Sequence, residues 1–166
     1  MSELSASSVE RSRASVVRLM VPADTNFSGI VFGGAILAEI DRVAYITATR
    51  HAHATTVTAS IDRVDFIEPV HVGDVVDFDA RLTWVGTTSM EVWVRVHAEE
   101  TAGGRPQLVG EAFVTMVAVD AEGKPVRVPP LVLGNEEERR RYEEGRERAE
   151  QRRRSRRRPE EQNNAV

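Results

Sequence analysis

The sequence predicts an α+β fold in which an antiparallel β-sheet curls around one long helix. Residues 35–50 (AILAEIDRVAYITATR) contain no Gly or Pro and are apolar around most of a helical circumference, as in a helix that its surroundings bury. After residue 56 the apolar spacing changes to a period of two, and short connections join the strand-like segments, which favours antiparallel hairpins. One small sheet hardly covers such a helix, so a second subunit is expected to help bury it.

The elements are expected in the following order. Residues 15–21 form a short strand that Pro22 ends, and residues 24–34 form a loop with three glycines. The helix at 35–50 has about four turns. Four strands follow at residues 56–66, 75–85, 89–99 and 108–119. In the second of these, one face is expected to carry Val76, Phe78, Ala80, Leu82 and Trp84.

The charged segments mark the domain boundaries. Residues 1–14 are predicted to be a disordered arm, residues 15–133 a single domain, and residues 134–166 a charged Arg/Glu-rich C-terminal tail. Between residues 136 and 161 the tail has eleven arginines against nine acidic residues. Its acid–arginine spacing of four supports a helix, but its apolar content is small, so we expect it to be solvated and frayed. The run at 152–158 (RRRSRRR) is the one patch suited to polyanions.

The composition excludes several classes of function. The chain of 166 residues has no cysteine, which rules out disulfides and thiol nucleophiles. No apolar run approaches membrane-spanning length, and the polar opening (MSELSASSVERSR) does not resemble a secretory signal, so a cytoplasmic protein with no membrane partner is expected. The net charge of −4 arises from an acidic body, which is a poor nucleic-acid binder.

Asp41 is the most informative candidate for chemistry. On a helical wheel it lies in an apolar stripe, far from the other charges of the helix before its last turn. Its neighbours three and four residues away are Leu37, Ala38, Ala44 and Tyr45. A carboxylate in such a stripe is costly to bury, so a functional role is slightly favoured over a local structural one.

Two further features precede the helix. Gly33 and Gly34 leave the helix start open to a ligand, and the first N–H groups of a helix have no internal partner, which suits a developing oxyanion. Asn26, in the same loop, has an amide able to polarise a carbonyl or hold a water, although the sequence taken alone favours a turn-forming role for it. The four histidines suggest no metal site. A Ser-His-Asp triad stays open, because geometry rather than sequence defines it, but no Gly-x-Ser-x-Gly elbow is present.

The chain resembles a known family in several separated blocks that occur in the same order. The stretch PADTNFSGIVFGGAILAEIDRVAYITATRHA, followed by VTASIDRVDFIEPVHVGDVV and GTTSMEVWVRV, is similar to the hotdog-fold acyl-CoA thioesterases of the bacterial YciA and brain acyl-CoA hydrolase types. The likeness runs from about residue 16 to residue 128. It implies a hotdog fold, dimers joined sheet edge to sheet edge, and assembly as a homohexamer, a trimer of dimers.

The resemblance also implies roles for residues. Asp41 matches the catalytic carboxylate, acting as general base or as nucleophile, and Asn26 matches its partner from the neighbouring subunit. The residue before Gly-Gly is often His in the family; here it is Phe32, as in the YciA type, which argues against a histidine in this role. The thioester carbonyl would face the N–H groups near Gly34. Contacts with coenzyme A are expected from Thr87, Thr88 and Ser89. No cofactor is expected, since coenzyme A belongs to substrate and product.

Two alternatives from other classes remain. The first is a non-catalytic acyl-CoA-binding hotdog module of the kind found in regulators, which usually carry a DNA-binding helix-turn-helix; the residues before the first strand are too few to form one. The second is a hotdog dehydratase, which needs a catalytic His placed beside an Asp. The predicted helix has Asp41 but no His before His51. Release of free thiol from acyl-CoA distinguishes the thioesterase from both.

Overall fold

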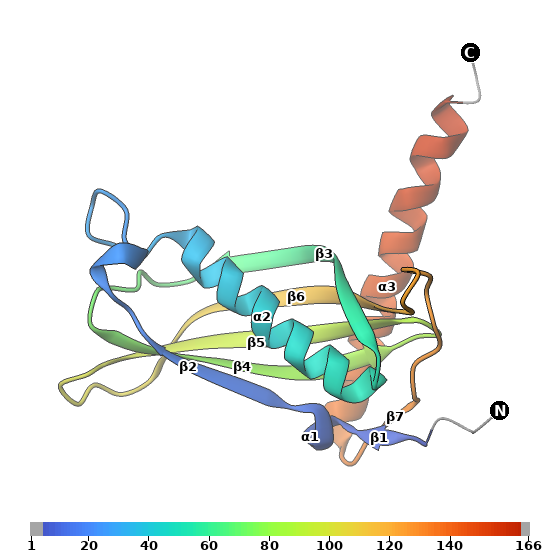
Figure 1. The fold of residues 1–166 in the computed structure, drawn as a ribbon, viewed down its shortest axis with the longest axis horizontal. Helices are drawn as coiled ribbons and strands as arrows, with labels where there is room; N and C mark the ends of the chain where they lie inside the picture. Colours follow the sequence, from blue (N-terminus) through green and yellow to red (C-terminus); the bar gives the residue numbers. More distant parts are fainter. Residues whose placement is uncertain (1–4, 164–166) are drawn as a thin grey trace.

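The computed structural model describes residues 5–163, with side chains described for residues 5–155. Figure 1 shows a curved sheet with one long helix across it and a second long helix that projects from the body. The elements follow in the order β1 (Ser7–Ser8), α1 (Val9–Ser12), β2 (Ala14–Leu19), the 3-10 helix η1 (Pro22–Asp24), α2 (Gly33–Ala52), β3 (Thr55–Phe66), β4 (Asp74–Val85), β5 (Ser89–Glu100), β6 (Gln107–Val119), β7 (Leu131–Val132) and α3 (Glu136–Asn163).

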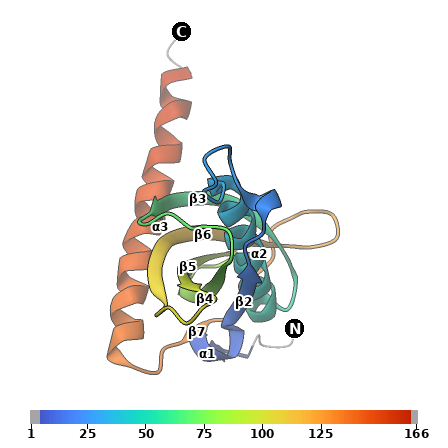
Figure 2. The same ribbon diagram turned by 90° about the vertical axis from the view of Figure 1, so that its left-hand side faces the viewer.

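The main sheet has five strands in the order β2-β4-β5-β6-β3, and every neighbouring pair is antiparallel. The strands β4, β5 and β6 are joined as consecutive hairpins, as their short connections predict. In the end-on view of Figure 2 the sheet curls around α2, while α3 runs along the opposite, convex side. The predicted α+β architecture, an antiparallel sheet wrapped around one central helix, is therefore confirmed.

The core forms between α2 and the concave face of the sheet. The helix contributes Ile36, Ile40, Val43, Ala44 and Ala48, all buried, on one continuous face. The sheet opposes them with β-branched and unbranched apolar side chains that are fully buried, among them Val76, Phe78, Val92, Val94, Val114 and Met116. This packing fixes the rotation of α2 about its axis and therefore the direction in which Asp41 points.

The C-terminal end of α2 is anchored through His51. Its side chain is fully buried, and Nε2 lies 2.8 Å from the carbonyl oxygen of Pro129. Because a carbonyl oxygen only accepts, Nε2 carries the proton and donates it. Burial lowers the pKa of His51 because the charged form loses its hydration. The helix ends at Ala52, and His53 after it adopts the left-handed conformation (φ 51°) that is common just after a helix.

The expected disordered arm at residues 1–14 is wrong for the part that the structure describes; residues 1–4 lie outside it. Ser7–Ser8 pairs in parallel with Leu131–Val132, and α1 follows directly. Val9 is only 5% exposed, so this segment contributes apolar burial to the fold. The segment is ordered because a second short strand, far away in the sequence, supplies its hydrogen-bond partner.

The prediction of a solvated and frayed tail is also wrong for residues 136–155, the part of α3 whose side chains the structure describes. The first part of α3 packs on the convex face of the sheet (Figures 1 and 2), where Ala149 is buried. Tyr142 donates a hydrogen bond from its hydroxyl to the carbonyl of Val85 (3.1 Å). The guanidinium of Arg141 lies 3.8 Å from the centroid of the Trp93 ring. Arginine stems and guanidinium stacking supply contact area that a count of apolar residues misses.

One face assignment within the sheet needs correction. Trp84 was expected to share a face with Leu82, but the pairing of β4 with β5 shifts register between these two residues. The inserted residue turns Trp84 to the convex face, where its ring meets α3. The other four residues of the predicted face do lie in the core.

Candidate active site

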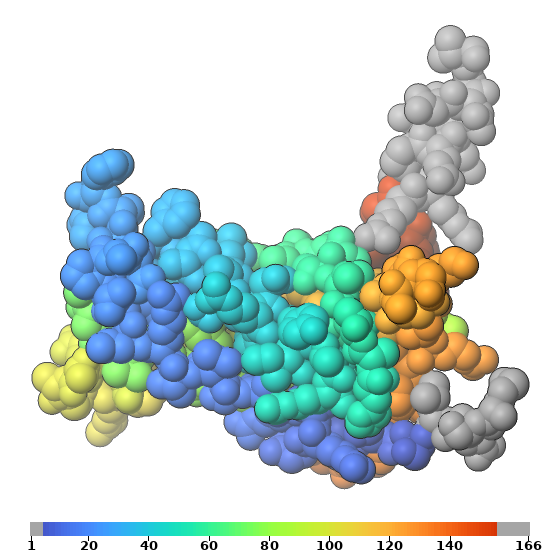
Figure 3. Space-filling model, in the orientation of Figure 1, coloured from blue at the N-terminus to red at the C-terminus, as the bar shows by residue number. Residues whose placement is uncertain are grey.

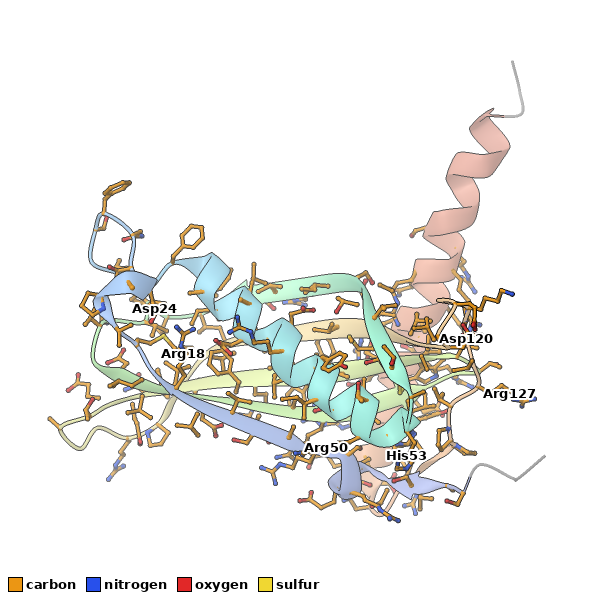
Figure 4. All side chains as sticks on the ribbon, viewed as in Figure 1. Arg18, Asp24, Arg50, His53, Asp120 and Arg127 are labelled. Atoms are coloured by element: carbon orange, nitrogen blue, oxygen red, sulfur yellow. The ribbon has the colours of Figure 1, made fainter. Side chains whose placement is uncertain are left out.

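The loop before α2 is anchored by buried ionic contacts. Arg18 of β2 reaches Asp24 (2.6 Å) and Glu39 of α2 (2.7 Å), and both carboxylates are almost fully buried. Figure 4 shows Arg18 and Asp24 side by side under the first part of α2. Arg42 adds a second cation to Glu39 (2.5 Å). These contacts tie the strand, the loop and the helix together, so the glycines at the helix start are held in a defined position.

Asn26 is exposed near the tip of this loop, which rises at one end of α2 in Figure 3. Its side-chain oxygen accepts hydrogen bonds from the backbone N–H groups of Ser28 (2.9 Å) and Ile30 (3.2 Å). The oxygen is therefore occupied by the turn, as the alternative interpretation of the sequence requires. The amide NH₂ group remains, so Asn26 can act outward only as a hydrogen-bond donor.

Gly33 and Gly34 form the first turn of α2 rather than the end of the loop. Among the residues that the structure describes, neither backbone N–H has a hydrogen-bond partner, and no side chain caps the helix. These donors lie at the positive end of the helix dipole, where an oxyanion is stabilised. A Cβ at Gly34 would overlap the ring of Phe32, and one at Gly33 would lie 3.3 Å from Phe66. Aromatic rings thus crowd both glycines.

Asp41 lies in the middle of α2, at the boundary between the buried face and the surface. The hydroxyl of Thr58 on β3 donates a hydrogen bond to its Oδ1 (2.6 Å). Within the described part of the chain no cation contacts Asp41; the neighbouring Arg42 pairs with Glu39 instead. The second carboxylate oxygen is thus available to a water or a substrate. Thr58 is absent from the sequence-based candidates, because nothing in the sequence pairs a strand residue with a helix residue 17 positions earlier.

An apolar cavity of about 400 Å³ opens beneath the first turn of α2. A volume in this range is typical of small-molecule sites. The cavity begins at the helix start, so a group bound there also meets the free N–H donors. Its walls come from the helix, the end of β3 and the sheet, and include Gly33, Ile36, Phe66, Ile67, Val96 and Val109.

Thr87, Thr88 and Ser89 are distant from this cavity in the same chain. They form the β4–β5 turn, where the carbonyls of Thr87 and Thr88 accept hydrogen bonds from the backbone N–H groups of Val128 and Ala118 (3.0 Å each). Ser89 begins the strand that seven residues later reaches Val96 in the cavity wall. At about 3.3 Å per residue the separation is roughly 23 Å.

Among the described residues no helix is long and apolar enough to span a membrane.

Comparisons with known proteins agree with this geometry. The family described as Thioesterase superfamily matches residues 28–104. The chain is 47% identical over 111 residues to the acyl-CoA thioester hydrolase YkhA of Bacillus subtilis, covering 67% of this chain and 64% of that protein. It is 44% identical over 115 residues to the acyl-CoA thioester hydrolase YciA of Escherichia coli, covering 67% and 86% respectively.

Solved structures are similar over nearly the whole chain. An apo-hexameric acyl-CoA thioesterase superposes with a TM-score of 0.87 and 47% identity, covering 92% of this chain and 97% of that one. The acyl-CoA hydrolase of Staphylococcus aureus, solved with butyryl coenzyme A and coenzyme A, superposes with a TM-score of 0.85 and 38% identity, covering 95% of each.

The same S. aureus enzyme has been solved as alanine variants of an asparagine, an aspartate and a threonine. These three residues are fifteen and then seventeen positions apart, which is the spacing of Asn26, Asp41 and Thr58 here. Family, relatives and fold agree. The chain belongs to the hotdog-fold acyl-CoA thioesterases of the thioesterase superfamily.

Proposed function

We propose that the protein hydrolyses acyl-CoA to a free carboxylic acid and coenzyme A, with Asp41 as the catalytic carboxylate and no cofactor. The observation that carries this proposal is the Asp41–Thr58 pair (2.6 Å), which holds one carboxylate oxygen and leaves the other open. An aspartate without a neighbouring cation is a competent base for water, or a competent nucleophile toward a thioester carbonyl. The free N–H groups of Gly33 and Gly34 supply the oxyanion site.

These two parts of the site come from different subunits. Gly34 and Asp41 are seven residues apart in one helix, so they are about 10 Å apart along its axis. Reacting atoms must approach to about 3–3.5 Å, so one thioester group cannot meet both residues of the same chain. A two-fold dimer that sets two α2 helices side by side pairs Asp41 of one subunit with the helix start and Asn26 of the other, and forms two equivalent sites.

Exposed apolar side chains support this assembly. Phe27 and Phe32 of the loop, Tyr45 of α2 and Val57 and Phe66 of β3 are all at least 40% exposed in the single chain. Exposed apolar side chains along α2, its preceding loop and the neighbouring strand β3 favour an interface over a free surface. We propose a dimer through this face and the assembly of three such dimers into a hexamer; two of the similar structures are described as hexameric. A cytoplasmic location remains a prediction.

Within a shared site each group has one role. The NH₂ group of Asn26 donates to the attacking water or the carbonyl, since its oxygen is occupied by the loop. The acyl chain extends into the apolar cavity beneath Gly33. Thr87, Thr88 and Ser89 can contact coenzyme A only from a second subunit, because they lie at the opposite end of their own sheet. The dimer axis brings opposite ends of two sheets together.

The test is a thiol-release assay with a panel of acyl-CoA substrates. The wild-type protein should release thiol, whereas Asp41→Asn should lower kcat by about 10²–10⁴-fold, the range for loss of a general acid–base group. Asp77→Asn is a matched control that should leave kcat unchanged, because Asp77 lies in β4 where this strand pairs with β2. Wild-type protein that binds acyl-CoA without releasing thiol would establish the non-catalytic binding module instead.

Subunit mixing tests the shared site. Asn26→Ala and Asp41→Ala are each expected to be nearly inactive. When the two are dissociated, mixed equally and reassembled, half of the dimers are mixed, and each mixed dimer has one intact site. About a quarter of wild-type activity should therefore return. A mixture that exchanges subunits and stays inactive would place both residues in one chain's site.

A further inference from the structure

Strand β3 does not alternate regularly along its length. Its pairing with β6 shifts register twice, between Thr58 and Ser60 and again between Ile61 and Arg63. Each shift inserts one extra residue, as in a β-bulge. Bulges bend a strand and change the direction of the side chains that follow, so these two determine where the middle of β3 points.

The bulges bring three side chains to the same face. In a regular strand, residues three apart point to opposite faces of the sheet. Here Thr58 reaches Asp41 of α2, while Ile61 and Val64 pack against the same core. Without the first bulge, which inserts Ala59, a strand that kept Ile61 in the core would turn Thr58 away from Asp41; the second bulge acts in the same way between Ile61 and Val64. The contact between Thr58 and Asp41 therefore depends on the bulged register.

Asp62, the inserted residue of the second bulge, is held at three points on the convex side. Its carboxylate accepts hydrogen bonds from Ser60 (2.8 Å) in β3 and from Thr115 (3.1 Å) in β6. The third contact comes from α3, where Nη1 of Arg152 lies 2.7 Å from Oδ2 of Asp62. This side chain of Arg152 is only 16% exposed, so solvent screens the contact weakly.

Arg152 also reaches the centre of the sheet. The same Nη1 lies 3.0 Å from Glu91 of β5, whose side chain is fully buried. Glu91 accepts further hydrogen bonds from Arg148 (2.8 Å) and Thr83 (2.8 Å), which fix its position. Arg152 thus bridges a rigid central strand and the bulge of a strand at the sheet edge.

We propose that Arg152 of α3 is a positioning residue for the reaction: it holds Asp62, which accepts a hydrogen bond from Ser60 directly after the first bulge, and so maintains the register of β3 that directs Thr58 at Asp41. The inference rests on the proposed role of Asp41. The ladder with β6 sets the register of β3, and the Arg152 contact secures it where the bulges interrupt that ladder. A small displacement of a group that orients a catalytic residue has a large effect on rate. The C-terminal helix is accordingly part of the functional unit although it contacts no reacting atom.

The test compares kinetics in two backgrounds. Arg152→Gln should lower kcat by at most about tenfold, the loss expected when the Thr58 hydroxyl itself is removed, with KM changed by less than about twofold, since the acyl cavity and the helix start are untouched. In a Thr58→Val protein, where the positioned group is already missing, Arg152→Gln should lower kcat by less than about twofold further. Equal losses in both backgrounds would overturn the proposal, because a general effect on folding does not depend on Thr58.

Three further variants separate the possible causes. Arg152→Lys keeps a positive donor and should recover most of the lost kcat. Asp62→Asn removes the carboxylate that Arg152 contacts, so it should lower kcat as Arg152→Gln does. It tests the same contact independently if Arg152→Gln folds poorly. Arg146→Gln, at an exposed arginine that pairs with Glu143 within α3, should leave kcat unchanged. If Asp41→Asn is inactive while Arg152→Gln and Asp62→Asn are normal, the positioning role alone is refuted; an active Asp41→Asn refutes the proposed function.

Discussion

Gly145 gives a test of whether α3 is docked on the sheet. It faces the convex side, and a Cβ added there would lie 2.8 Å from Cβ of Trp84 and 2.9 Å from Oε1 of Glu91. Neither atom can retreat easily. The Trp84 atom is attached directly to the strand backbone, and the Glu91 carboxylate is held by Arg148 and Arg152. Gly145→Ala must therefore push the helix away from the sheet.

Two effects of opposite sign compete in this variant. Alanine favours a helix over glycine by about 0.5–1 kcal/mol, because it restricts the unfolded backbone. Inserting a methyl group into a closely packed contact typically costs about 1–3 kcal/mol. Displacing the helix also lengthens the hydrogen bonds of a fully buried carboxylate. The packing loss is larger, so Gly145→Ala should lower the free energy of unfolding by about 1–2 kcal/mol.

Urea unfolding followed by tryptophan fluorescence measures this change. Both tryptophans of the chain, Trp84 and Trp93, lie at the contact with α3. Protein concentration must be equal between variants, because the stability of an oligomer depends on it. The midpoint should fall, whereas Arg146→Ala, at an exposed site of the same helix, should change it little. A raised midpoint for Gly145→Ala would mean that α3 is a free helix, and the reasoning about Glu91 and Arg152 would fail with it.

Three other perturbations have defined outcomes. Thr58→Val should lower kcat about tenfold in the thiol-release assay by releasing Asp41, and an unchanged kcat would contradict this role. Because the pKa of His51 is lowered in the folded state, the unfolded state binds the extra proton. Thermal stability should therefore fall as pH drops below about 6.5, by at most about 1.4 kcal/mol per pH unit; His51→Gln should lose this dependence and His53→Gln should keep it. Val109→Phe narrows the cavity and should reduce kcat/KM for long-chain acyl-CoA more than for acetyl-CoA. An equal reduction of kcat/KM for both substrates would mean that the acyl chain binds elsewhere.

Periodicity predicted the elements well because burial on one side of a strand or helix leaves a direct pattern in the sequence. The helix at 35–50 lies within α2, and the alternation of residues 90–96 matches the buried face of β5. Periodicity fails where one residue is inserted. Trp84 changes face at the bulge in β4, and the first bulge of β3 brings Thr58 and Ile61 to one face. Bulges depend on partner strands, so a single segment does not reveal them.

The candidate site was predictable to the extent that it lies on consecutive residues. Asp41 and the Gly33-Gly34 pair belong to one helix, and their spacing alone places them about two turns apart. Thr58 required tertiary structure, because it meets Asp41 only after the chain turns back. The orientation of the Asn26 amide also needed the structure, since its oxygen could have faced outward as readily as its NH₂ group.

The charge pattern of the chain acquires a structural meaning from α3. Glu91 is fully buried, and an unpaired carboxylate there would be very costly. The arginines that face the sheet neutralise it, so part of the positive charge of the tail serves the acidic body rather than an external polyanion. A coenzyme A phosphate that approached Arg152 would meet Asp62 and Glu91 beside it, both already paired with this arginine. Arg152 is therefore unsuited to phosphate binding, and its loss should change kcat rather than KM.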